Sequence, residues 1–249
     1  MAKKIHFSRN VGGTLPQIVD RSTQETLRAF GNKWYDSDRH GWPWDVQDTD
    51  RWTEVEVLDA TKALSGGIHA YHLHVTGESE DVGIYGADKK IWDIGKGLVM
   101  EARFALHIAP TVGSDIYLGV QNDSYGVASQ RIFNADEVAK YAAIGFYATV
   151  GAGLGICIRT DDGTKVSGIV DTGQVVVLDA YHRFVIDFTN LASVRFFMDG
   201  NRLAPSTIFA MDTAANLAVQ PILMGTKVGI DAGLGDFYLD YVRMWQTSR

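Results

Sequence analysis

The sequence predicts an all-β protein whose strands form two facing antiparallel sheets. Short runs place an apolar residue at every second position, which is the pattern of a strand with one buried face. Twenty-six glycines and five prolines separate these runs along the chain. No long segment repeats its apolar residues with the 3.6-residue period of an α-helix. About a dozen strands with regularly spaced turns are typical of a sandwich or a barrel.

The first clear strands lie between residues 68 and 107. Residues 68–75 place Tyr71 and Leu73 on one face and His72 and His74 on the other. Residues 98–107 alternate in the same way, and their apolar face carries Leu98, Met100, Ala102, Phe104 and Leu106. The opposite face of this strand carries Val99, Glu101, Arg103, Ala105 and His107. Two further strands are expected at residues 116–121 and 142–150.

The C-terminal half predicts short strands that are joined by tight turns. Asp161-Asp162-Gly163 and Asp199-Gly200-Asn201 are typical of hairpins, because glycine tolerates the positive φ that such turns require. The expected strands are residues 153–160, 166–170, 175–178, 181–189, 194–198, 217–225 and 236–245. Two short helices are expected at residues 23–30 and 135–141.

The first 50 residues differ from the rest of the chain in composition and in hydrophobic patterning. Trp34, Tyr35, Trp42 and Trp44 stand among charged residues and glycines, and alternation is weak. We therefore predict an irregular N-terminal arm or cap over residues 1–50, docked on a β-sandwich domain over residues 51–249. The four aromatic residues either close the open edge of the core or form a contact surface for a partner or a sugar ring. They are the predicted partner-binding residues.

Composition and charge argue against several classes of function. The formal charge of −7 and the absence of a basic run disfavour a nucleic-acid-binding surface. No stretch approaches the roughly 20 apolar residues of a membrane-spanning helix. The basic N-terminus is not followed by the apolar run of a secretory signal, so folding in the cytoplasm is expected. Cys157, the single cysteine, lies in an apolar run that predicts a small buried side chain.

The acidic residues lack the arrangement that glycoside hydrolysis requires. A retaining glycosidase needs two carboxylates about 5 Å apart, one as nucleophile and one as acid. Glu54 and Glu56 share a strand face, and Glu78, Glu80 and Asp81 fall in a predicted loop, so we interpret both groups as solvated edges. We therefore predict no catalytic residue and no cofactor.

One polar strand face is a candidate for glycan binding. Glu101, Arg103 and His107 project from the same side of residues 98–107. The alternative interpretation is an exposed ion pair between Glu101 and Arg103, which would contribute less than about 1 kcal/mol.

Histidines and acidic loops suggest metal sites only weakly. His72 and His74 share a strand face near His69, a spacing that can chelate a metal with a third ligand. Exposed histidines on a half-buried strand are the simpler interpretation. Residues 45–50 and 121–124 are rich in acidic and amide side chains, but neither run has the ligand order of a calcium loop. We predict no metal site.

Two stretches resemble the jelly-roll strands of the concanavalin A-like lectin/glucanase superfamily. Residues 181–188 (YHRFVIDF) and 194–200 (VRFFMDG) resemble its aromatic-rich strand and the Asp-Gly hairpin that follows. Residues 237–245 (FYLDYVRMW) resemble its last strand. These motifs are specific for the fold and not for an activity.

The resemblance implies a jelly roll whose function depends on the branch of the superfamily. Members include glucanases, alginate lyases, lectins and structural proteins of tailed-phage particles, and the N-terminal arm with no catalytic signature is most similar to the last group. This implies a non-catalytic virion protein that decorates or cements the capsid and is made in the host cytoplasm. Its partners would be the major capsid protein or other virion proteins and sister subunits, with a trimer favoured.

An alternative function remains open within the same fold. The chain is then a carbohydrate-binding module, or a glycan-active hydrolase or lyase, with surface glycans as its partners. A shared fold does not decide between these functions.

Overall fold

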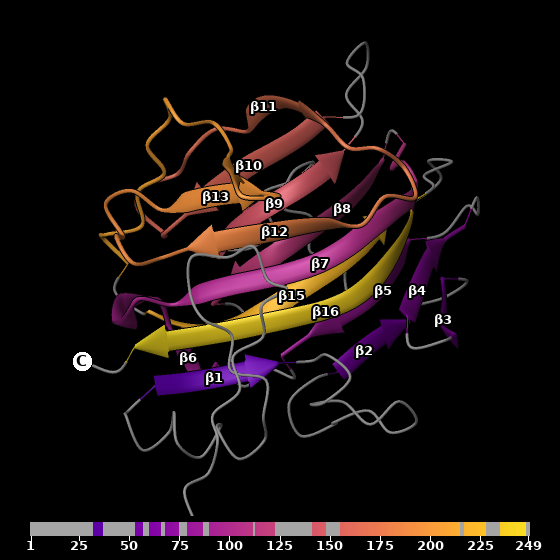
Figure 1. Ribbon diagram of the computed structural model, residues 1–249, viewed down its shortest axis with the longest axis horizontal. Helices are drawn as coiled ribbons and strands as arrows, with labels where there is room; N and C mark the ends of the chain where they lie inside the picture. Colours follow the sequence, from indigo (N-terminus) through magenta and orange to yellow (C-terminus); the bar gives the residue numbers. More distant parts are fainter. Residues whose placement is uncertain are drawn as a thin grey trace, which may run out of the picture.

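The computed structural model describes residues 32–36, 53–56, 60–65, 68–74, 79–86, 90–111, 113–122, 141–147, 155–214, 217–227 and 235–247. Within these residues the chain forms strands β1 to β16 and one short 3-10 helix, η1 (Ile94–Lys96). Every strand pairing is antiparallel, and the strands divide into two sheets. Figure 1 shows the sheets as two layers, with β7, β12 and β16 in the layer nearer the viewer. The predicted all-β jelly-roll sandwich is confirmed.

The first sheet has the order β14-β13-β12-β7-β16-β4-β3, and β1 also pairs with β16. Its strands are β1 (Asn32–Asp36), β3 (Thr61–Ser65), β4 (Ile68–Leu73), β7 (Val99–Ile108), β12 (His182–Asp187), β13 (Arg195–Met198), β14 (Asn201–Arg202) and β16 (Gly235–Thr247). The long strand β16 holds this sheet together, because it pairs with β7 along one side and with β4 and β1 along the other.

The second sheet has the order β11-β10-β9-β8-β15-β5-β2, and β6 also pairs with β15. Its strands are β2 (Thr53–Glu56), β5 (Glu80–Tyr85), β6 (Trp92–Asp93), β8 (Ser114–Gln121), β9 (Tyr141–Tyr147), β10 (Gly155–Asp161), β11 (Val170–Val175) and β15 (Ala218–Lys227).

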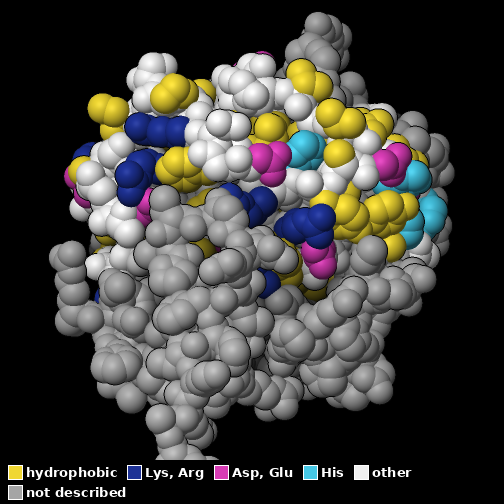
Figure 2. Space-filling model, viewed as in Figure 1, with side chains coloured by type: hydrophobic (Ala, Val, Ile, Leu, Met, Phe, Trp, Pro, Cys, Tyr) yellow, Lys and Arg dark blue, Asp and Glu magenta, His cyan; other side chains and the backbone are white. Residues whose placement is uncertain are grey.

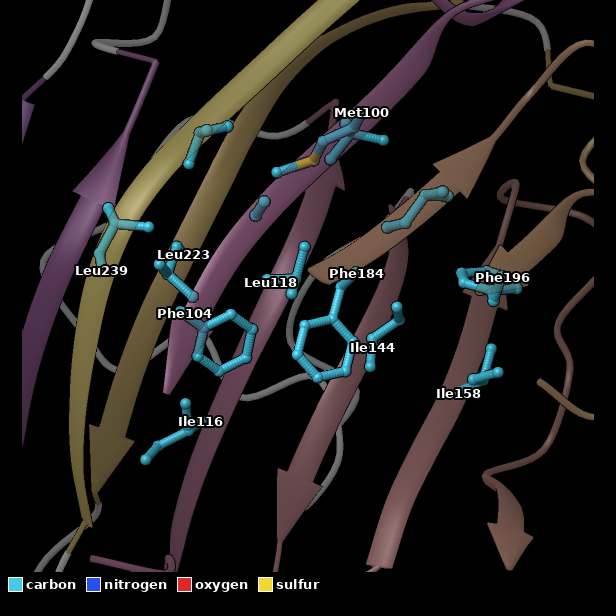
Figure 3. Packing of buried hydrophobic residues seen from close by; sticks show 14 of the residues in the cluster. Met100, Phe104, Ile116, Leu118, Ile144, Ile158, Phe184, Phe196, Leu223 and Leu239 are labelled. Carbon is cyan, nitrogen blue, oxygen red and sulfur yellow. The ribbon is translucent and has the colours of Figure 1, made fainter. Parts of the chain in front are cut away.

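The core lies between the two sheets and is built from the alternating apolar residues. All five residues of the predicted apolar face of residues 98–107 are buried. The rings of Phe104 and Phe184 stack with centroids 4.8 Å apart. Figure 3 shows these rings on the first sheet facing Leu118 and Ile144 of the second. Alternation along the sequence therefore identified the core face correctly.

The positive φ angles predicted for the two Asp-Gly turns are confirmed. Gly163 has φ +84° after β10, and Asp199 and Gly200 have φ +50° and +85° between β13 and β14. These values lie in the left-handed region that glycine adopts without strain and that aspartate tolerates.

The structure differs from the expected elements between residues 166 and 178. The strand is β11 at Val170–Val175, in place of two strands at residues 166–170 and 175–178. Pairing with β10 determines this strand, whereas most of the valines that suggested the other two are exposed. The helix expected at residues 23–30 lies outside the described residues, as do residues 135–140 of the second. Tyr141 begins β9.

Part of the predicted arm belongs to the first sheet. Residues 32–36 form β1, in which Trp34 pairs with Trp245 and Tyr35 with Met244 along the backbone. Trp42 and Trp44 lie outside the described residues. Where the structure describes the chain, it contains no helix long and apolar enough to cross a bilayer.

Candidate functional site

The outer side of the first sheet carries a polar and aromatic face. Strand alternation directs the side chains of Glu101, Arg103 and His107 away from the core. The backbone register brings Arg183 and Tyr241 opposite Arg103. The whole surface, called the polar face below, comprises Glu101, Arg103, His107, Tyr181, Arg183, Tyr238, Asp240, Tyr241 and Arg243. On the side of the molecule that carries this face, Figure 2 shows basic, acidic and histidine side chains interspersed with hydrophobic ones.

Glu101 lies at the centre of this face and is held by three partners. Its side chain is almost fully buried, although it points away from the core. The Tyr241 hydroxyl donates a hydrogen bond to Glu101 Oε1 over 2.8 Å. The guanidinium groups of Arg243 and Arg183 lie 3.7 and 4.0 Å from its two oxygens. Burial and the nearby Glu101 charge raise the pKa of Tyr241, so this phenol remains a protonated donor.

Arg103 is fixed between a carboxylate and an aromatic ring. It forms an ion pair and hydrogen bond with Asp240, and its guanidinium carbon lies 4.6 Å from the centroid of the Tyr181 ring. Burial and the Asp240 charge raise the pKa of Tyr181, which keeps the phenol neutral. The ion pair considered between Arg103 and Glu101 does not form. The reason is a register shift in β16 between Leu239 and Tyr241, which inserts Asp240 beside Arg103.

Tyr238 lies between two histidines farther along the same face. The His107 ring stacks on Tyr238 with centroids 5.2 Å apart, and its Nδ1 lies 2.6 Å from Asp179 Oδ1. On the other side, the edge of His72 approaches Tyr238 at 6.5 Å, and His72 Nδ1 lies 3.0 Å from Asp236. Burial, together with Asp236 and Asp179, raises the pKa of Tyr238. This ring is therefore held in place and uncharged.

Of the histidines that suggested a metal site, His72 forms an ion pair with Asp236, and the backbone N–H of His74 donates to Glu80 Oε2 at 2.7 Å. The side chain of His69 lies outside the described part of the structure. Among the residues that the structure describes, no three His, Cys, Asp or Glu side chains lie close enough together to hold an ion.

The outer side of the second sheet is different, because the polar side chains of its central strands are buried. They come from the neighbouring strands β5, β8 and β15 and are all at most 2% exposed: Asp81, Asp115, Gln121, Gln220 and Thr226. An incoming ligand therefore meets the polar face of the first sheet more readily than this surface. The sequence pattern gave no signal that these residues are buried.

The prediction that Glu80 and Asp81 lie in a solvated loop is wrong. They begin β5 and are buried, because β15 brings Lys227 alongside. The Lys227 ammonium lies 3.4 Å from Glu80 Oε1 and donates to the His74 carbonyl at 2.5 Å. Lys227 lies 147 positions after Glu80 in the sequence, and its positive charge offsets the free-energy cost of burying the Glu80 carboxylate.

Solved structures with the same architecture include lectin domains and glucanase relatives. The metal-free carbohydrate recognition domain of Emp46p is 12% identical, with 83% of this chain and 94% of that chain covered and a TM-score of 0.54. The fold is that of the concanavalin A-like lectins and glucanases. No protein-family model and no curated protein sequence matches this chain.

Two further solved structures share this architecture. A protein of unknown function from Shewanella oneidensis MR-1 is 11% identical and has a TM-score of 0.58. The match covers 95% of this chain and 99% of the Shewanella chain. An immunostimulatory antigen and pseudo beta-1,3-glucanase of Mycobacterium tuberculosis is 15% identical, with 82% and 94% covered and a TM-score of 0.51. At these identities the similarity shows the fold alone.

Proposed function

We propose that this protein binds carbohydrate on the polar face of its first sheet and does not catalyse a reaction there. The observation that carries the proposal is the Arg103 group, in which one guanidinium is fixed by Asp240 and lies over the half-buried Tyr181 ring. The fold supports the proposal, since lectin domains and glucanases share it.

The chemistry of the face suits a sugar. The CH face of a pyranose packs on an aromatic ring, and its hydroxyls need donors and acceptors in fixed positions. Tyr181 and Tyr238 supply half-exposed rings. Arg103 and Asp240 supply a donor and an acceptor whose positions their mutual ion pair holds before binding. Such preorganisation reduces the entropy that a side chain loses when a ligand binds.

The state of Glu101 disfavours catalysis at this face. A general acid or nucleophile must reach the scissile bond, but the Glu101 carboxylate is buried beneath Tyr241 and two arginines. We therefore expect no glycan turnover from the unmodified protein or from the Glu101→Gln variant. Reducing-end release from a polysaccharide panel that is lost in Glu101→Gln would refute the non-catalytic part of the proposal.

Binding is tested on a glycan array that includes β-1,3-glucans, followed by calorimetry with the strongest glycan. Arg103→Ala and Tyr181→Ala/Asp240→Asn are expected to weaken that binding at least about tenfold, which corresponds to about 1.4 kcal/mol. Lys165→Ala is the matched control, since it removes a paired surface cation from the turn after β10, away from the polar face. Equal losses in all variants, or no glycan bound by the unmodified protein, would refute the proposal.

The virion role is a separate proposal that rests on the sequence resemblance and the N-terminal arm. It requires stoichiometric association with particles, which carbohydrate binding does not. Deleting residues 1–30 is expected to abolish co-sedimentation with purified phage particles while the sandwich stays folded. Undiminished co-sedimentation of the truncated chain would contradict the arm's role.

A further inference from the structure

Exposed apolar side chains gather around one strand of the second sheet. In the part of the chain that the structure describes, seven large hydrophobic residues are exposed, and five of them lie within residues 166–178. They are Val166, Ile169, Val175, Val177 and Leu178, with exposures between 39% and 69%. Residues 166–178 are called the β11 margin below. Scattered single hydrophobic residues need no explanation, but a run of this kind indicates a contact surface.

The β11 margin lies at the free end of the second sheet. β11 is the last strand in the order, and Figure 1 shows it at the upper border of that layer. Natural proteins usually protect such ends by making the strand very short or charged. β14 ends the first sheet with two residues, and β2 ends the other side of the second with four, among them Glu54 and Glu56. The β11 margin combines a six-residue strand with exposed valines, so it lacks this protection.

The charge pattern permits a second copy of the chain to approach this margin. The whole chain carries a formal charge of −7, so two copies repel each other over most of their surfaces. Residues 166–178 contain a single charged residue, Asp171. Two copies that meet at the β11 margin therefore bury apolar area where the electrostatic cost is lowest.

The sequence of the margin is also suited to a twofold axis. An antiparallel meeting about the centre of β11 sets Val170 of one copy beside Val175 of the other. The same arrangement sets Asp171 beside Gln174, which pairs a carboxylate with an amide donor and avoids facing like charges. It also brings the valines after β11 toward Ile169 of the second copy.

A bulge makes this a contact of side chains more than a continued sheet. Gly173 has φ +67°, and its N–H donates to Asp171 Oδ1 at 2.8 Å, while the Gln174 N–H donates to Thr172 Oγ1 at 3.3 Å. Both N–H groups are satisfied inside the strand, so they are not available to a neighbouring strand. Fibre-like extension of the sheet is thereby disfavoured, whereas apolar packing remains open.

We infer that two copies of this chain associate through the β11 margin. The dimer requires no carbohydrate, because the exposed apolar side chains of the margin are not members of the polar face, although Asp179, directly after the margin, contacts His107 at the end of that face. If the polar face binds sugar, a dimer presents two such faces and gains avidity for a repeated glycan.

The test measures molar mass by light scattering during size-exclusion chromatography, over a range of protein concentrations and without sugar. The unmodified chain is expected to approach twice 27.4 kDa as concentration rises. Val175→Asp/Val177→Asp is expected to weaken association at least tenfold with unchanged circular dichroism. Ile208→Asp is the matched control, because Ile208 is equally exposed but lies outside the margin.

Three results would overturn the inference. The first is an unmodified chain that stays monomeric at the highest concentration. The second is a double variant that associates as strongly as the unmodified chain. The third is an Ile208→Asp variant that loses association to the same extent. None of these results bears on sugar binding, so failure here and failure of the proposed function are distinguishable.

Discussion

Asp162 shows how one side chain can hold together two loops that are distant in the sequence. Its Oδ1 accepts backbone N–H bonds from Thr164 and Lys165, and its Oδ2 accepts bonds from the backbone and the hydroxyl of Thr213. Burial alone would raise the pKa of Asp162, but the hydrogen bonds outweigh this effect and lower it from 3.8 to about 2. The carboxylate therefore stabilises the folded state when it is ionised.

Asp162→Asn is expected to lower the free energy of unfolding at pH 7 by about 2 kcal/mol, because an amide nitrogen cannot accept the bonds it replaces. The folded-state pKa is the lower one, so this stabilisation is complete above the unfolded value of 3.8 and is lost as pH falls through about 2. At pH 3 the difference from the unmodified chain should be about half as large. Urea unfolding at both pH values measures it.

Asp212→Asn provides the control for this prediction. Asp212 forms an exposed ion pair with Lys165 in the same region, and its replacement should leave stability nearly unchanged. An Asp162→Asn effect no larger than that of Asp212→Asn would contradict the role given to the buried hydrogen bonds.

Individual residues of the polar face were partly predictable. Alternation is sufficient to place Glu101, Arg103 and His107 on one side of β7, and the structure confirms this placement. Their partners were not predictable, since Asp240 reaches Arg103 only through a register shift, and Asp179 reaches His107 from a loop. A one-residue bulge leaves little trace in hydrophobic periodicity.

The pairing of β5 with β15 brings together two charged side chains that are buried in the folded protein. It buries Glu80 and Lys227 completely, and the two groups lie 3.4 Å apart. Taking one partner away from a buried pair leaves the remaining charge in a poorly solvated site, which typically costs about 3 to 5 kcal/mol.

Lys227→Met is therefore expected to destabilise the fold by about 3 to 5 kcal/mol. Lys227→Met/Glu80→Gln should recover part of this loss, because the neutral amide that replaces the carboxylate can still accept the His74 N–H. Chemical denaturation of the single and double variants completes the cycle. A Lys227→Met variant that loses less than about 1 kcal/mol would show that the pair contributes no more than a surface ion pair.

Strands with one buried face were easier to predict than strands at the edges. β7 and β12 match their expected alternation because each packs against the core. The predicted position of β11 was wrong because backbone pairing with β10 determines where this strand lies. The exposed valines around it follow a strand-like pattern in the sequence although they are not buried. A strand prediction that assumes apolar residues are buried fails where such residues are exposed.

For the whole molecule, the two sheets share one core but differ in their outer surfaces. The first sheet presents the half-exposed rings and paired arginines of the polar face, whereas the polar side chains on the central strands of the second sheet are buried. The sequence predicted the sandwich from alternation and from the Asp-Gly hairpins. It could not reveal which outer surface remains accessible, because that depends on contacts between residues far apart along the chain.

NMR titration of the isotope-labelled chain with the strongest glycan from the array tests the central claim most directly. We predict saturable shifts of backbone amides in β7, β12 and β16 and of the Arg103 Nε–H, with little change around Asp115 and Gln121 on the second sheet. Shifts confined to the second sheet, or no saturable shift on the polar face, would contradict carbohydrate binding at this site.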